Sequence, residues 1–370
     1  MGGPEIHIGD VGTQSVSIVA ASLNKASGLH LGPVKGANTL KVSGNTVEIV
    51  ASAKNVAKGV DAGKGADVTI GSSNAESVSI AGIKTGESQE GADEQAYGIF
   101  NVNQAQTKVY GKTVNVVAKG AKDTRAIHVA NNTEAQDKSA TLTIVGDEVC
   151  ITAESDDPDH STVGISAMSH GQVHITGNTV VTASDAIVAR GSSVVSINAD
   201  GRHYTQINGN VNFSYDAPTS GTSVDATVVL NLVGPESSWT GNMVVTWNGT
   251  PTNKDEYLSV TGMKLGLSKG AVWTPVETGH DSTTVTLGQK YTALNLLENN
   301  DGVINITDSA IDVTVEKMTG TGGTVNLAAD LTAEEGSQTG RITIDEADAN
   351  SKIDVKLKDA KMERLSLIHI

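Results

Sequence analysis

The chain has 370 residues, of which 38% are hydrophobic, 3% aromatic and 18% charged, and 40 are glycine. Its 26 basic and 42 acidic side chains give a formal net charge of −16, which argues against binding to nucleic acid or to an anionic membrane surface. No segment approaches the ~20 apolar residues of a spanning helix. The first residues also lack the basic and apolar regions of a signal peptide.

One sequence motif, predicted to form a strand, a turn and a second strand, recurs several times in the first half of the chain. In each copy an alternating apolar pair is followed by a glycine turn and then by a second alternating pair. The copies are Lys41–Ala51, Lys108–Ala118, Thr143–Ala153 and His174–Ala183. Repetition of one such unit predicts a stack of similar coils with a long surface.

A second phrase precedes the first in each unit. It begins with a small residue that is followed at once by Ile or Val, as at Gly59, Gly98, Ala126, Gly164 and Ala186. The apolar residue that ends each middle strand serves as a marker of the repeat. Subtraction of successive marker numbers gives spacings of 28, 39, 35, 31 and 22 residues for Val42, Ile70, Val109, Ile144, Ile175 and Ile197. The strand pattern of the unit is therefore constant, and the differences in spacing come from loops of variable length.

Each unit is expected to hold three strands of three to five residues, with one apolar and one polar face. A single unit could not bury its apolar face alone. Stacking gives every strand a parallel neighbour above and below, which satisfies the backbone hydrogen bonds and forms internal ladders of Val, Ile and Ala. The connections are rich in Gly, Asn, Asp and Ser and lack an amphipathic helical pattern. These features together predict an all-β parallel β-helix.

Cys150 is the only cysteine, so no disulfide can form within the chain. It occupies an alternate position of an expected strand and has no basic neighbour in sequence, so we interpret it as a small strand side chain and not as a reactive thiol.

The last six residues, Leu365–Ile370, break the alternation without a turn signal. We interpret them as a non-native tail and expect the natural protein to continue.

Downstream of residue 213 the expected alternating strands become longer, and the sequence motifs differ from those of the first half. These later motifs are Ser237–Asn242, which contains Trp239, then Leu265–Trp273, Gly302–Ile306 and Gly323–Leu327. At these residues, over about 226 to 345, the chain resembles the passenger domain of Gram-negative autotransporters, the type V secreted class that includes pertactin-like proteins. The resemblance implies a right-handed parallel β-helix at the cell surface, exported through the periplasm and outer membrane by the protein's own outer-membrane β-barrel.

We therefore expect a single elongated domain, a solenoid with protruding loops. Its expected parts are an N-terminal cap or first coils at 1–38, coils with variable loops at 39–225, pertactin-like C-terminal coils at 226–360 and the non-native tail at 361–370.

Three segments contain residue types used in catalysis or metal binding. Gly279–Thr283 has a Gly-x-Asp-Ser order but continues into a strand, so we interpret it as a turn. The acidic loop Glu154–His160 offers oxygen ligands for calcium or carboxylates for glycoside hydrolysis, yet its spacing fits no EF-hand and resembles a solvated turn. His170 and His174 are separated by Gly171, so a zinc pair is not expected. No catalytic, cofactor-binding or metal residue is assigned.

The three tryptophans, Trp239, Trp247 and Trp273, are expected to pack over coil corners and not to stack on sugars. The polar segments Lys84–Gln95 and Asn131–Ser139 interrupt the repeats, as binding loops do on rigid frames, although they also fit tolerated insertions without a partner. Tyr97, Phe100, Tyr110 and His128 lie near loops and could line a contact surface, but no spacing identifies them as a site.

Three functions fit these observations. The first is an adhesin that binds host matrix protein or glycan, or associates with its own copies. The second is a carbohydrate-active β-helix enzyme of the polysaccharide lyase or glycosidase kind. The third is a structural spacer that carries a missing functional domain. We favour the non-enzymatic adhesin, because the sequence shows repeats and loops but no convergent catalytic set.

Overall fold

The computed structural model describes residues 5–10, 12–32, 38–87, 93–120, 122–131, 139–216, 226–248, 261–276, 291–308, 311–330 and 338–361. All regular elements in these ranges are strands. They are β1 (Glu5–Ile8), β2 (Ser15–Ser22), β3 (Lys25–Leu31), β4 (Asn38–Val42), β5 (Thr46–Ala53), β6 (Val56–Ala62), β7 (Ala66–Gly71), β8 (Ser77–Lys84), β9 (Gln95–Val102), β10 (Gln106–Tyr110), β11 (Thr113–Lys119), β12 (Asp123–Ala130), β13 (Ala140–Glu154), β14 (Thr162–Met168), β15 (Gly171–Arg190), β16 (Val194–Ile197), β17 (Thr205–Asp216), β18 (Ala226–Val233), β19 (Ser238–Thr240), β20 (Met243–Asn248), β21 (Thr261–Ser268), β22 (Val272–Thr274), β23 (Tyr291–Ile306), β24 (Asp312–Asp330), β25 (Gln338–Thr339), β26 (Arg341–Ala347) and β27 (Asp354–Lys361).

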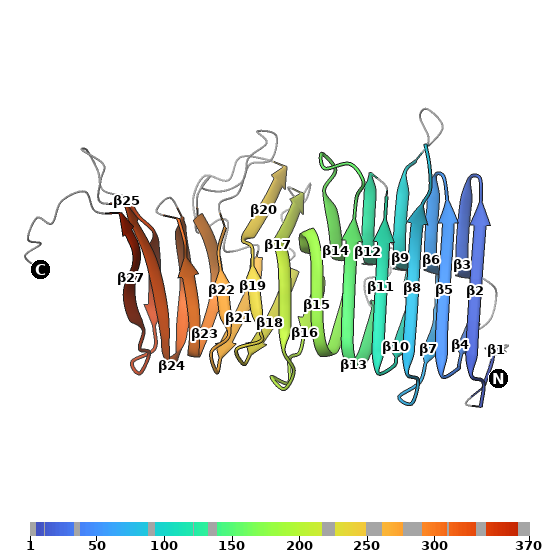
Figure 1. The fold of residues 1–370 in the computed structure, drawn as a ribbon, viewed down its shortest axis with the longest axis horizontal. Coiled ribbons are helices and arrows are strands. Elements are labelled where there is room, and N and C mark those ends of the chain that lie inside the picture. The colour runs from blue at the N-terminus through green and yellow to red at the C-terminus, as the bar shows by residue number, and fades with distance from the viewer. Residues whose placement is uncertain are drawn as a thin grey trace, which may run out of the picture.

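The protein is all-β, and its strands pair in parallel with their equivalents in neighbouring repeats. The exception is the two-residue strand β25, which pairs antiparallel with the end of β24. The strands form three columns along the molecule, with the first and last strands at opposite ends (Figure 1). The first column holds β1, β4, β7, β10, the beginnings of β13 and β15, β16, β18, β21, the beginnings of β23 and β24, and β26. The second holds β2, β5, β8, β11, the end of β13, the middle of β15, the beginning of β17, β19, β22, the ends of β23 and β24, and β27. The third holds β3, β6, β9, β12, β14 and the ends of β15 and β17, followed by β20.

The marker residues of the sequence form one continuous ladder in the first column. Val42 pairs with Ile70, which pairs with Val109, and the line continues through Ile144, Ile175 and Ile197 to Leu230. All of these side chains are buried. The pairing therefore confirms the repeat frame that the variable spacings of 22 to 39 residues predict. Pairing also continues from β16 to β18, across the change in sequence style near residue 213.

Strand lengths differ from the expected three to five residues. β15 runs for 20 residues through all three columns, and β13 runs for 15 residues through two. In these repeats the corner between columns lies within one continuous strand, so the glycines read as turns, Gly146 and Gly177, are strand residues. The register of β13 with β15 shifts at this corner, where Gly177 has a φ of 134°. A corner needs only a local bend when few residues separate the two columns.

A line of small residues marks the third column and explains the second sequence phrase. A Cβ atom built on Gly98 would lie 2.7 Å from Cγ1 of Val116 and 2.6 Å from the carbonyl oxygen of Ala126. Gly59 and Gly164 have the same two kinds of neighbour at 2.6 to 2.8 Å. A side chain larger than a methyl group would collide with the second column across the narrow interior, so the sequence keeps Gly or Ala at this position.

The interior of the second column carries the largest side chains. Trp239 pairs with Trp273, and their rings are fully buried and stacked, with centroids 5.1 Å apart and an interplanar angle of 11°. Each indole N–H donates to a corner carbonyl, Trp239 to Gly209 at 3.0 Å and Trp273 to Gly241 at 3.2 Å. The expected place over a coil corner is therefore wrong for both residues, because their rings lie inside the stack and only their N–H groups reach a corner. The side chain of Trp247 is outside the described set.

We expect Trp273→Ala to lower the free energy of unfolding by about 3–5 kcal/mol, the usual cost of removing a large buried aromatic side chain. Thermal denaturation followed by circular dichroism measures this change. Thr240→Ala, at an exposed position of the neighbouring strand, is the matched control and should change stability by less than about 0.5 kcal/mol. Equal melting temperatures for Trp273→Ala and the parent chain would contradict the buried pair.

Gly98→Val should destabilise the protein by about 1–3 kcal/mol or more, because the added atoms meet backbone and the Val116 methyl group. Ala126→Gly, on the same line, should cost no more than about 1 kcal/mol, since it removes a methyl group and adds only chain entropy. Urea denaturation of both variants compares the two costs. A tolerated valine at position 98 would show that the interior is wider than the close contacts indicate.

Candidate functional site

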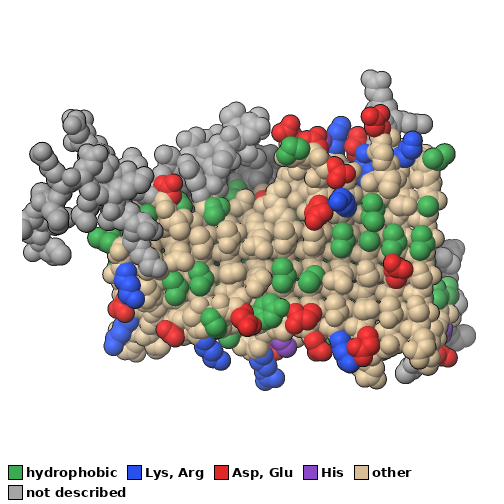
Figure 2. Space-filling view, viewed as in Figure 1, with side chains coloured by type: hydrophobic (Ala, Val, Ile, Leu, Met, Phe, Trp, Pro, Cys, Tyr) green, Lys and Arg blue, Asp and Glu red, His purple; other side chains and the backbone are tan. Residues whose placement is uncertain are grey.

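Loops of three successive repeats meet at the corner between the second and third columns. They follow β8, β11 and β13 and border an open hollow of about 800 Å³. We call this region the corner hollow and define it by Lys84, Glu94, Lys122, Asp156 and His160 among its lining residues. Figure 2 shows acidic and basic side chains gathered along the upper margin over these loops. Two segments that the sequence singles out separately, the described parts of Lys84–Gln95 and the acidic loop Glu154–His160, thus line one site.

Ion pairs connect the loops around the corner hollow. Glu94 lies 3.5 Å from Nζ of Lys84 and 3.6 Å from Nζ of Lys122, so one carboxylate joins two repeats. Nζ of Lys84 also donates to the carbonyl of Gly86 at 2.8 Å. Lys84 is 10% exposed and Lys122 is 63% exposed. The first lysine therefore fixes its loop, and the second presents its charge to solvent.

The acidic loop is organised by its own side chains. Asp157 accepts a hydrogen bond from the Asp159 backbone N–H at 3.0 Å, and its other carboxylate oxygen lies 3.2 Å from Nδ1 of His160. Ser155 accepts from the Asp157 backbone N–H at 3.2 Å. These contacts are those of an Asx turn. Within the described ranges, no three His, Cys, Asp or Glu side chains are grouped as a metal site requires.

A polar aromatic cluster lies on the outer face of the third column, beside the corner hollow. Phe100 stacks on His128 with ring centroids 5.1 Å apart, and Tyr97 lies 5.0 Å from Phe100. Nζ of Lys58 stands 3.6 Å above the Phe100 ring. Tyr97 donates to Asp123, which also accepts from Nε of Arg125 at 2.6 Å. The sequence places Tyr97, Phe100 and His128 near loops but does not show that they touch, because they are neighbours only through the register of β6, β9 and β12.

His128 is buried in this cluster and uncharged. Burial first, and the Arg125 guanidinium second, lower the pKa of His128 to about 3. Nη1 of Arg125 and Oγ of Ser166 each lie 3.2 Å from its Nδ1. Because arginine can only donate, Nδ1 is an acceptor and the ring proton is on Nε2. Ser166 is fully buried, and the nitrogen that faces it is shared with a cation, so the group lacks the geometry of a serine-histidine-carboxylate triad.

The remaining sequence candidates lie apart from this cluster. Tyr110 is on β10 in the first column, away from Tyr97, Phe100 and His128 on the third. His170 is in a turn with a φ of 64°, whereas His174 is on β15. Gly279–Thr283 and residues 132–138 of the expected loop Asn131–Ser139 are outside the described ranges.

Burial, followed by the charge of Glu148, raises the pKa of the free Cys150 thiol, which makes it less reactive.

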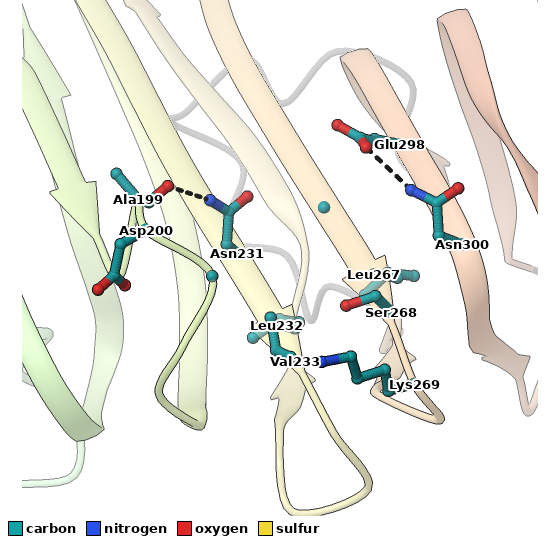
Figure 3. A pocket seen from close by; sticks show the side chains of 12 residues that line it. Ala199, Asp200, Asn231, Leu232, Val233, Leu267, Ser268, Lys269, Glu298 and Asn300 are labelled. Carbon is teal, nitrogen blue, oxygen red and sulfur yellow. Dashed lines mark hydrogen bonds between the residues drawn. The ribbon is translucent and has the colours of Figure 1, made fainter.

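A second, smaller hollow of about 240 Å³ lies on the first column, and the sequence does not indicate it. It forms where Gly266 stands in register between Asn231 and Glu298 and leaves a side-chain position empty. Figure 3 shows Asn231 directed toward the carbonyl of Ala199, to which it donates at 3.2 Å, and Asn300 directed toward Glu298. The amides of Asn231 and Asn300 and the carboxylate of Glu298 are thus already hydrogen-bonded, and the hollow is smaller than most ligand pockets.

Comparison with known proteins gives no relative: no family model, no curated protein and no solved structure matches the chain. The described part of the chain also holds no helix able to cross a lipid bilayer.

Acid should destabilise the protein partly through His128. Its folded pKa is near 3, against 6.5 for an unperturbed imidazole, so the unfolded state binds the proton more tightly. Stability from this group is complete above pH 6.5 and falls by about 1.4 kcal/mol per pH unit below it. Urea denaturation between pH 7 and pH 4 should show a shallower loss for His128→Gln than for the parent chain. Identical slopes would mean that His128 is not buried in its neutral form.

Proposed function

We propose that the chain is the passenger of an autotransporter, folds as a right-handed parallel β-helix and acts at the cell surface as an adhesin, without enzymatic activity of its own. The proposed partners are a host matrix protein, a glycan or other copies of the chain. The proposed route to the surface runs through the periplasm and the protein's own outer-membrane β-barrel. Support comes from the motifs over residues 226 to 345 and from the parallel columns, not from any relative.

The observation that carries the adhesin proposal is the convergence of three loops on the corner hollow. A parallel frame fixes the spacing of its corners, so loops from successive repeats present one composite surface while the frame below stays unchanged. Lys122 and Asp156 offer opposite charges at its border. Such a border suits a polar partner with hydrogen-bonding groups, which agrees with a glycan or a hydrophilic segment of a matrix protein.

Binding of the purified chain to an array of glycans and matrix proteins tests this function. We expect saturable binding to at least one class and a loss of at least tenfold in affinity for Lys122→Glu combined with Asp156→Lys, which reverses both exposed charges without touching the interior. Lys108→Glu, on the outer face of β10, is the control and should bind as the parent does. Absence of binding to every array member would contradict the adhesin and favour the spacer. Binding unaffected by the double reversal would place the adhesive surface elsewhere.

A further inference from the structure

A further hollow of about 390 Å³ adjoins the corner hollow on its C-terminal side, and we call it the adjoining hollow. It extends from the end of β11, around the acidic loop, to the corner inside β15. The residues that line it but not the corner hollow are Lys119, Glu154, Pro158, Thr162 and Ser184. The residues that line both hollows are Ser155, Asp156, Asp157 and His160. The acidic loop is therefore the boundary between two halves of one site.

The two hollows together extend along the stack. Lys84 ends β8, Lys119 ends β11, Glu154 ends β13 and Ser184 lies within β15. These four strands are successive neighbours in the second column (Figure 1). Neighbouring strands lie about 4.8 Å apart, so the first and the last of the four are roughly 14 Å apart. A ligand that contacts both hollows must therefore be an extended chain that runs along the stack.

The carboxylate of Asp156 lies between the two hollows and is free to bind a ligand. Its Oδ2 atom is 3.3 Å from the place that a Cβ atom would take on Gly120, whose φ of 85° also favours glycine. Within the described residues this carboxylate has no hydrogen-bond or ion-pair partner, in contrast to that of Asp157. Asp156 can therefore accept hydrogen bonds from groups in either hollow.

The floor and the rim of the adjoining hollow are held in place by polar contacts. Thr162 is buried, and its hydroxyl lies 3.1 Å from Oγ of Ser184. The backbone N–H of each of these residues donates to the hydroxyl of the other, at 3.2 and 3.0 Å. The rim carries the exposed ion pair of Lys119 and Glu154 at 3.5 Å, which joins two repeats. Groups that are already ordered lose little freedom when a ligand binds.

The side chains that line the two hollows are polar with one exception. Among the described lining residues, Pro158 is the one apolar side chain. Proteins commonly recognise peptides through an apolar groove, an unpaired strand edge or a cluster of arginines. The described lining has none of these, since β8, β11, β13 and β15 are paired on both sides. Carboxylates, ammonium groups and hydroxyls suit a ligand with hydroxyl groups along its whole length, which is the chemistry of a carbohydrate chain.

The charge of the lining disfavours an anionic carbohydrate, because carboxylates outnumber lysines. The carboxylates are those of Glu87, Glu94, Glu154, Asp156 and Asp157, and the lysines are Lys84, Lys119 and Lys122. The whole chain also has a net charge of −16. A sugar with carboxylate or sulfate groups would approach against like charge, which costs affinity. The hydroxyl groups of an uncharged sugar can instead donate to the carboxylates in charge-assisted hydrogen bonds.

From the span, polarity and charge of the two hollows, we propose that this corner binds an uncharged linear oligosaccharide that runs along the stack. One part of the ligand occupies the corner hollow, the next part occupies the adjoining hollow, and Asp156 accepts hydrogen bonds from the hydroxyl groups between them. This inference rests on the proposed adhesive function, because it names the class of ligand for the same site. It adds that affinity depends on the length and on the neutrality of the carbohydrate.

Isothermal titration calorimetry with defined oligosaccharides tests the proposal. The neutral probes are β-linked gluco-, manno- and galacto-oligosaccharides from disaccharide to hexasaccharide, and the acidic probes are oligogalacturonates of the same lengths. In at least one neutral series we expect affinity to rise at least tenfold from the disaccharide to the hexasaccharide, because only the longer ligand reaches both hollows. The oligogalacturonates should bind at least tenfold more weakly at equal length. Affinity that is independent of length, or tighter binding of the acidic probes, would overturn the proposal.

Lys119→Ala combined with Glu154→Ala tests the adjoining hollow alone and leaves the net charge unchanged. The hexasaccharide should lose at least fivefold in affinity, while the disaccharide, held in the larger corner hollow, should bind as it does to the parent chain. The matched control is Lys112→Ala combined with Glu76→Ala, an exposed ion pair of 2.6 Å that joins two repeats at the other corner of the second column. It should change neither affinity.

Ser184→Trp fills the adjoining hollow from an exposed position and should lower hexasaccharide affinity in the same way, with folding checked by circular dichroism. A hexasaccharide that binds both hollow variants as tightly as the parent chain would overturn the proposal.

The outcomes separate this proposal from the adhesive function on which it rests. A chain that binds a matrix protein or its own copies, but no neutral series, keeps the adhesive function and overturns the carbohydrate proposal. A chain that binds no member of the array and no oligosaccharide overturns both. A neutral hexasaccharide whose affinity is unchanged by Lys122→Glu combined with Asp156→Lys binds elsewhere on the chain, which leaves the adhesive function standing and overturns this use of the corner.

Discussion

Parallel backbone pairing between each repeat and the next is the constraint on which the rest of this structure depends. A strand in the middle of a column obtains its hydrogen bonds from the repeats on both sides, so no repeat can shift by one residue without turning its apolar side chains outward. The ladder that begins at Val42 shows the result, since one inner position is occupied by a buried aliphatic residue repeat after repeat. The interior is consequently narrow, which is why a line of Gly and Ala runs beside the second column.

This constraint separates the positions that stabilise the protein from those free to vary. The inner positions must match in size along the stack, and the stacked pair of Trp239 and Trp273 shows that a large residue is accepted where its neighbour in register is also large. Corners and outer faces carry no such requirement. Charged loops gather at one corner, and an aromatic network around His128 lies on the adjoining face. Binding surfaces can therefore arise on several sides of one unchanged frame.

The sequence predicts the frame better than it predicts the surface. Strand alternation and the marker residues identify the inner ladder, because burial restricts the residues allowed at a position that every repeat shares. The sequence identifies Tyr97, Phe100 and His128 as aromatic residues near loops but not their contact, since they meet only through the register of strands that lie in different repeats. The hollow beside Gly266 is equally hidden, because it arises from a missing side chain between two neighbouring strands. The positions of the tryptophan rings depend on the interior width, which no local pattern reports.

The register of the marker ladder has a consequence for how such a molecule changes in length. Because each boundary between repeats is the same kind of parallel contact, a duplicated unit can enter the stack without altering the ones beside it, and a deleted unit leaves two compatible edges to rejoin. Every unit gained or lost changes the span by about 4.8 Å. The distance over which the protein extends is therefore set by copy number, so recombination between repeats can adjust that distance while both the core and the loops retained on either side stay as they were.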